Sequence, residues 1–268
     1  MKTNATGSNR LKFERPEPHV WGNIVTGYGS DYNVVIQGEE ASSPNAPNQH
    51  SAGTIFAATA PYTPPAVSDL DPACGTTSVT LNTSGATYPL SSAVGTYRFC
   101  NVKLESNSKL VVSGTGQITV HVRDDLIIRN TASIDSDAPI RFVIGKAFEI
   151  DTSTPLGVDY SPTASWKDPR KLKFDLANSG TEAVKLKAPS GSVHNADGSP
   201  TLRLYGQVYA PNRLIETTGG RIKVFGNLTG GTAKWSNGHL EVHNPLTAGG
   251  DDEGGGSSTA SVVFWRQL

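Results

Sequence analysis

Two segments of the chain repeat the same arrangement of apolar and polar positions. Each apolar residue in 118–128 lies 22 positions before its counterpart in 140–150. Apolar and polar residues alternate within each segment, which places the apolar side chains on one face of a strand. The alternation breaks at 123–125 and 145–147, where the chain can bend into another short strand. The pattern predicts coils of short strands, each of which buries its inner face by stacking on the next.

A second, shorter repeat has a glycine at its centre. Its three copies read aliphatic, aromatic, glycine, amide, aliphatic and occupy residues 20–24, 204–208 and 224–228. The last two copies are 20 residues apart, again one coil. The shared glycines, Gly22, Gly206 and Gly226, predict corners at which the backbones of neighbouring coils approach closely. Because the first copy matches the last two, we expect residues 20–38 to stack beside the final coils.

These repeats predict an all-β fold, a single-stranded parallel β-helix, over residues 20–268. Residues 1–19 are expected to form a flexible N-terminal segment. Three excursions interrupt the strand pattern and are expected to be long surface loops: 41–72, 151–170 and 246–260.

Composition agrees with short strands and excludes some classes of function. The 268 residues include 28 glycines and 17 prolines, and 36% of them are hydrophobic. The formal net charge is −1 and no Lys/Arg cluster is interleaved with aromatic residues along the chain, which excludes a nucleic-acid partner. No stretch approaches the roughly 18 apolar residues of a membrane helix. The polar N-terminus does not read as a signal peptide, so we expect any membrane or secretion element to be missing from this chain.

Two cysteines, Cys74 and Cys100, bracket a segment rich in threonine, serine and glycine. A disulfide between them would close a loop of about 25 residues, worth about 3 kcal/mol in the chain-entropy description. It would also fit an oxidising location. The alternative is two unrelated buried thiols, and we favour the disulfide.

The most ligand-like set of residues is His239, Glu241 and His243, spaced around Leu240 and Val242. On a strand, the three polar side chains would share the outward face and could meet a divalent metal. Successive ligands would be about 6.5 to 7 Å apart, which is awkward for one ion without help from a neighbouring coil. A solvated strand face is therefore the favoured interpretation, and no cofactor is expected.

Acidic residues invite comparison with β-helical polysaccharide lyases and hydrolases, which set carboxylates and a basic residue on one outer face. The residues are Asp124, Asp125, Asp135, Asp137 and Asp151. A glycosidase needs two carboxyls about 5 to 10 Å apart beside a groove. Most of these residues fall at bends, where aspartate is favoured for turn chemistry, so a turn role is the favoured interpretation.

Several aromatic residues lie in polar or proline-rich segments: Tyr28, Tyr32, Tyr62, Tyr160 and Trp166. Such side chains stack on sugars or fill protein interfaces. Packing over the solenoid is the alternative.

The segment 206–212, Gly-Gln-Val-Tyr-Ala-Pro-Asn, is followed by Leu214, the Gly226 coil and a closing Trp265-Arg266 pair. This arrangement resembles the C-terminal β-helix domain of PilX-type pilus-assembly and pilin-like surface proteins, with Pro211 and Asn212 at a coil corner. The resemblance spans roughly residues 95–268 and, more loosely, 20–38. Two features depart from the family: Gln267 stands where an acidic residue is frequent, and the pilin-like N-terminal helix is absent from this chain.

The resemblance implies a right-handed parallel β-helix on the cell surface without enzymatic activity. We therefore expect an extracellular structural or adhesive module, associated with type IV pili as a minor pilin-like protein. Its partners would be other pilus or cell-surface proteins and surface polysaccharide, and it would meet a membrane only through the absent N-terminal helix. The alternative is a carbohydrate-active β-helix enzyme, a polysaccharide lyase or hydrolase. Binding to an ordered lattice such as ice would need a ladder of threonines, and none repeats at the coil spacing.

Overall fold

The computed structural model describes most of the chain between residues 77 and 243 and short strands near both chain ends. The described ranges are 77–159, 166–177, 180–188, 202–236 and 239–243, with strands at 2–3, 11–13, 24–26, 34–36, 39–41, 55–57 and 262–264 and the single residues Val67, Cys74 and Ser161. Every regular element in these ranges is a strand. They contain no helix long and apolar enough to cross a membrane.

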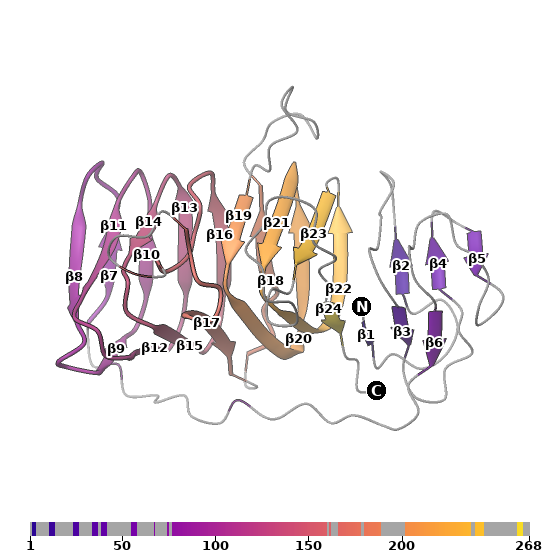
Figure 1. Ribbon diagram of the computed structural model, residues 1–268, viewed down its shortest axis with the longest axis horizontal. Helices are drawn as coiled ribbons and strands as arrows, with labels where there is room; N and C mark the ends of the chain where they lie inside the picture. The colour runs from indigo at the N-terminus through magenta and orange to yellow at the C-terminus, as the bar shows by residue number, and fades with distance from the viewer. Residues whose placement is uncertain are drawn as a thin grey trace.

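Successive coils stack so that equivalent strands pair in parallel along three faces (Figure 1). The first face contains β9 (Thr96–Phe99), β12 (Ile118–Val122), β15 (Ile140–Ile144), β17 (Leu172–Leu176), the beginnings of β20 (Gln207–Thr218) and β22 (Leu228–Ser236), and β24 (Val262–Phe264). The second face contains β7 (Val79–Leu81), β10 (Val102–Leu104), β13 (Leu126–Asn130), β16 (Phe148–Thr152), β18 (Val184–Lys187) and the ends of β20 and β22. The third face contains β8 (Thr87–Ser91), β11 (Lys109–Ser113) and β14 (Ser133–Asp135), then β19 (Leu202–Tyr205), β21 (Arg221–Phe225) and β23 (His239–His243).

The predicted fold class is confirmed: the chain is an all-β parallel solenoid of about 6 turns. An isolated parallel bridge between Leu156 and Leu204 continues the third face between its two groups of strands. The right-handed sense implied by the family resemblance stays a prediction.

The predicted offset of 22 residues is the register of the stack. Ile118 pairs with Ile140 on the first face, and Leu126 pairs with Phe148 on the second. These side chains point inward and are at most 1% exposed. Aromatic rings fill the widest part of the core, where Phe174 lies 5.3 Å from Phe142 and 4.6 Å from Phe148 between ring centroids. Because burying one such side chain contributes about 1.5–3 kcal/mol, the continuous apolar columns stabilise the whole stack.

Glycines form the corners between the third face and the first. Gly206 follows β19 and Gly226 follows β21, one coil apart. Gly226 has a φ of 140°, and a Cβ atom there would overlap the carbonyl oxygen of Gly206. The close approach of backbone that the repeated glycine predicts is therefore present at this pair of corners. Gly22 lies outside the described residues.

The N-terminal strands extend the stack at its C-terminal end (Figure 1). Here β1 (Lys2–Thr3) lies between β24 and β3 (Ile24–Thr26), and β3 pairs with β6 (Ile55–Ala57). The expectation that residues 20–38 stack beside the final coils is confirmed for β3. The strands β2 (Leu11–Phe13), β4 (Val34–Ile36) and β5 (Glu39–Ala41) form a separate small sheet.

The position of β3 also matches the short glycine repeat. Thr229, Val263, Lys2 and Val25 share one column of paired residues. Ile24 therefore holds the same place on β3 as Leu228 holds on β22, and these are the last residues of their two repeat copies. The sheet order then runs from β6 at this end to β7 at the opposite end, so the chain between these two strands spans the length of the stack.

Candidate functional site

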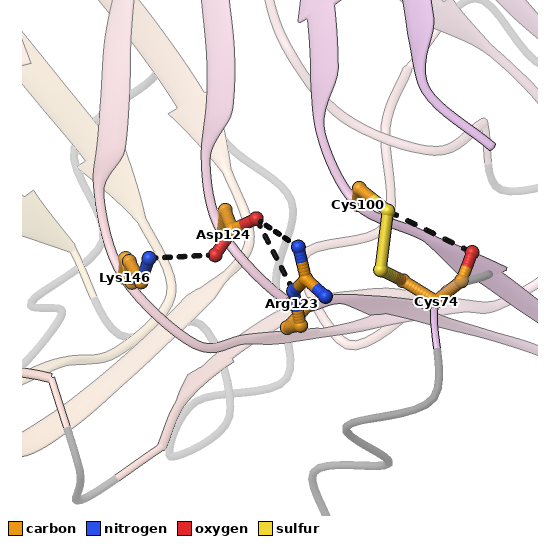
Figure 2. The surroundings of a disulfide bond; sticks show 5 residues. All are labelled: Cys74, Cys100, Arg123, Asp124 and Lys146. Atoms are coloured by element: carbon orange, nitrogen blue, oxygen red, sulfur yellow. Dashed lines mark hydrogen bonds and ion pairs between the residues drawn. A yellow bond between two sulfur atoms is a disulfide. The ribbon is translucent and has the colours of Figure 1, made fainter. Parts of the chain in front are cut away.

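A disulfide closes the corner where the first coil turns from the first face to the second (Figure 2). Cys74 and Cys100 are bonded, with their Cα atoms 5.0 Å apart, and both are buried. Cys100 directly follows β9. The predicted disulfide is confirmed, and it attaches the chain preceding β7 to the stack.

Residues at the same corner of the next two coils continue this column. The Asp124 amide donates a hydrogen bond to the Cys100 carbonyl, and the Lys146 amide donates to the Asp124 carbonyl, each at 2.9 Å. Side chains reinforce the column, since the Asp124 carboxylate accepts from Arg123 at 2.9 Å and pairs with Lys146 at 2.8 Å (Figure 2). These hydrogen bonds lower the pKa of Asp124. Asp124 therefore serves as an ionised link between coils.

Arg213 fastens the same edge two coils further along. It lies where the register of β20 shifts between Ala210 and Leu214, and it is 2% exposed. Its guanidinium donates to the carbonyl oxygens of three residues, Gly145 at 2.6 Å, Ala177 at 2.7 Å and Lys146. Burial lowers the pKa of Arg213. A Cβ atom at Gly180 would overlap the guanidinium, so the glycine there makes room for it.

Sequence reasoning missed Arg213, although it follows the predicted corner residues Pro211 and Asn212 directly. Pro211 is buried and Asn212 is exposed, and both lie within β20 beside the register shift. The available signal was a charged residue on the inward phase of an otherwise apolar strand. Such a residue must find hydrogen-bond partners inside the protein.

The second face carries an ion-pair network centred on Glu149. Its Oε1 accepts hydrogen bonds from Arg129 Nε at 2.9 Å and from Lys187 Nζ at 3.0 Å. Arg129 also lies 3.5 Å from Glu105. Burial opposes ionisation of Glu149, but the two hydrogen bonds outweigh it and lower the pKa of the carboxyl. The three coils are thus joined by charge as well as by backbone.

Asp151 lies two residues beyond Glu149 on β16 and is half-buried. Burial raises the pKa of Asp151, the negative charge of Glu149 adds to the rise, and Lys187 and Arg129 oppose it. Two neighbouring carboxyls on one strand therefore have their pKa values displaced in opposite directions. Such a divergence accompanies acid and base roles in enzymes and also occurs in structural ion-pair networks.

The five aspartates singled out in the sequence do not converge on one site. Asp124 and Asp125 lie at the corner between β12 and β13, and Asp135 and Asp137 lie between the third face and the first. Asp151 is on the second face. The backbone carbonyl of Asp137 accepts a hydrogen bond from Lys171 at 2.7 Å. These positions fit turn and coil-linking roles.

The metal prediction falls on β23, which contains His239, Glu241 and His243. The side chains of these three residues lie outside the described part of the structure. In register they face Arg221, Lys223 and Phe225 of β21. Neither a cation nor a phenyl ring is a metal ligand, so the paired coil does not supply the additional ligand that the strand spacing demands. The side chains that the structure describes include no cluster of three ligands for a metal.

Of the aromatic residues predicted to bind a ligand, only Trp166 is described. Its side chain is 39% exposed, beside the Lys167–Asp159 ion pair. Tyr28, Tyr32, Tyr62 and Tyr160 lie outside the described residues.

A basic and aromatic surface forms where β19 and β21 stack; we call it the β19–β21 surface, and it consists of Arg203, Tyr205, Arg221, Lys223 and Phe225. The rings of Tyr205 and Phe225 stack with centroids 4.4 Å apart and planes 6° from parallel. Lys223 Nζ lies 4.9 Å from the centre of the Phe225 ring. Arg203 is directly in register with Lys223. All five side chains are partly exposed.

The sequence reasoning missed this surface because no single segment contains it. Arg203 and Tyr205 belong to one coil and Lys223 and Phe225 to the next, 20 residues later. The signal was already present in the glycine repeat, whose spacing aligns the two aromatic positions and the cations two residues before them.

The fold places this chain in the class of parallel β-helices with charged outer faces. No known family, curated protein or solved structure matches it.

Proposed function

We propose that this protein is a non-enzymatic structural and adhesive module that works outside the cell. The observation that carries the proposal is the Cys74–Cys100 disulfide, which fastens the first coil of a continuously cored solenoid. Disulfides persist in oxidising surroundings such as the cell exterior. Stacked coils give an extended surface whose positions repeat along one axis, which suits the binding of other extended molecules.

The roles of the charged residues support a structural task. Asp124 links neighbouring corners, Glu149 joins three coils of the second face, and Arg213 holds the carbonyl oxygens of two earlier coils. Each of these groups is engaged by partners within the chain. They stiffen the stack and do not depend on a substrate for compensation of their charge.

Attachment to type IV pili is the finer part of this proposal, and it rests on the motif around Pro211 and Asn212. The expected partners are pilus and other cell-surface proteins. The test is to shear surface filaments from the source cells and probe the fractions with an antibody against this chain. Co-sedimentation with the filaments supports the proposal, and recovery only in the cytosolic fraction would overturn it.

Adhesion without catalysis is tested by incubating the full chain with immobilised and soluble polysaccharides, both neutral and acidic. We expect an immobilised polysaccharide to retain the protein, while size-exclusion chromatography shows soluble polymers of unchanged length. Shortening of a polymer by the purified protein would contradict the proposal.

One observation favours a carbohydrate-active enzyme as the second candidate. Glu149 and Asp151 lie two residues apart on one strand, with the pKa of the first lowered and that of the second raised. A pair of this kind can divide the roles of ionised carboxylate and proton donor. If the enzyme candidate is correct, the chain-length assay will show shortening that Asp151→Asn abolishes.

A further inference from the structure

We propose that the β19–β21 surface binds an acidic polysaccharide, a polymer of uronic acids, along the axis of the stack. This inference rests on the adhesive function proposed above and names the ligand of that function. It is carried by two rows of side chains that the coil register creates. One row holds cations and the other holds aromatic rings.

The cation row places like charges next to each other without compensation. Arg203 and Lys223 are directly in register on neighbouring strands, whose backbones are about 4.8 Å apart. Like charges directly opposite each other destabilise a sheet. Neither side chain has an ion pair with a carboxylate among the described residues. The second face shows the opposite arrangement, since Arg129 and Lys187 both bind Glu149 there.

A polymer with regularly spaced carboxylates would remove this repulsion. The Arg203 guanidinium offers a planar fork that matches a carboxylate in a bidentate pair, and the Lys223 ammonium offers a point charge one coil further along. Because these groups repeat along the axis, one linear polyanion can engage both at once. A single small anion would neutralise the same charges but would gain nothing from the coil repeat.

The ring row favours a sugar polymer over a nucleic acid. Proteins that bind single-stranded nucleic acids use open aromatic faces on which bases stack. Here one face of Phe225 is occupied by Tyr205, and Lys223 lies over the ring. The remaining ring edges and the Tyr205 hydroxyl offer the mixture of apolar and polar contact that aromatic residues give to sugars.

The test uses the full chain and biolayer interferometry with immobilised polygalacturonate, dextran and single-stranded DNA. The double variant Arg203→Gln/Lys223→Gln removes two charges from the surface. The matched control Lys103→Gln/Lys109→Gln removes two charges from β10 and β11, where both lysines are partly or fully exposed. Circular dichroism melting of each variant verifies that it folds.

We expect the wild-type chain to bind polygalacturonate, and the surface variant to weaken that binding by about tenfold or more. The control should change the dissociation constant by less than about twofold. Equal weakening by both variants would refute the site, because binding would then follow net charge. Tighter binding of DNA with the same dependence on the surface variant would replace the polysaccharide by a nucleic acid.

The failure of this inference can be told apart from failure of the proposed function. Retention of dextran without polygalacturonate overturns the inference and leaves an adhesive module. Shortening of polygalacturonate in solution overturns the proposed function itself.

Discussion

Replacing Arg213 by methionine tests whether one buried side chain holds the corners of the stack together. Methionine retains an unbranched, apolar stem of similar reach and removes all the donors. The carbonyl oxygens of Gly145, Lys146 and Ala177 would each lose a hydrogen bond from a charged group. An unsatisfied buried carbonyl costs about 1–3 kcal/mol. Relaxation and the relief of a desolvated charge offset part of that loss, so we expect destabilisation of about 3–5 kcal/mol.

The assay is equilibrium urea unfolding, combined with hydrogen exchange of the backbone amides near 145–147 and 177. Exchange is needed because stacked coils can open locally, and a single midpoint then mixes several events. Arg213→Met should speed exchange at these corners and lower the unfolding midpoint. The matched control is Arg203→Met on the partly exposed outer side of β19, which should change stability by no more than about 0.5 kcal/mol.

A change in Arg213→Met as small as that in Arg203→Met would refute the reasoning. It would mean that water or the neighbouring backbone satisfies the three carbonyls without the guanidinium. Faster exchange across every coil, with no excess at the corners, would also count against a local fastening role.

Three further predictions concern the corners, the charged face and the disulfide. Gly226→Ala should destabilise the protein by at least about 1–3 kcal/mol, because its φ is 140° and the added Cβ would overlap the Gly206 carbonyl, whereas Gly116→Ala, whose Cβ would meet Ser92 at 3.5 Å, should have a small effect; thermal melting of both variants decides. The lowered pKa of Glu149 means that its stabilising contribution exists above its unfolded pKa and disappears as pH falls through its folded pKa, so Glu149→Gln should lower the melting temperature at pH 7 and match wild type in strong acid. The raised pKa of Asp151 has the opposite sign: stability is present below its unfolded pKa and is lost as pH rises through its folded pKa, so Asp151→Asn should raise the melting temperature at pH 7, and a decrease there would contradict the assigned shift. Cys74→Ser/Cys100→Ser should cost about 3 kcal/mol for a bond that spans 26 residues, and dithiothreitol should reproduce the loss in the wild-type chain but leave the variant unchanged.

The sequence was sufficient to predict the coils because solenoid stacking repeats a local pattern. Alternation with a period of two identified the inward residues, and the offset between Ile118 and Ile140 is the strand register itself. Gly206 and Gly226 were identifiable for a similar reason, since only glycine fits where two backbones approach so closely. The return of Ile24 to the far end of the stack followed from the same repeat.

The outer surfaces were harder to predict, because each depends on which residues of different coils become neighbours. Arg213 reaches carbonyl oxygens 67 and 68 residues earlier, and nothing in its local sequence identifies them. The Glu149 network joins residues 20 and 38 positions away through diagonal contacts between strands. The search for a cation cluster along the chain also missed Arg203 and Lys223, which come together only through stacking.

The pairing of β1 with β24 has a consequence for the order in which the protein folds. Lys2 lies beside Val263, so a strand synthesised first finds its place only after almost the entire chain has been made. Contacts between residues so distant in sequence form slowly, because the ends of a long chain must first be brought together. The coils from β7 onward can assemble one upon another as they emerge from the ribosome. The N-terminal strands must then wait unpaired until β24 arrives, and their exposed edges make this interval the one in which the chain is most open to association with other molecules.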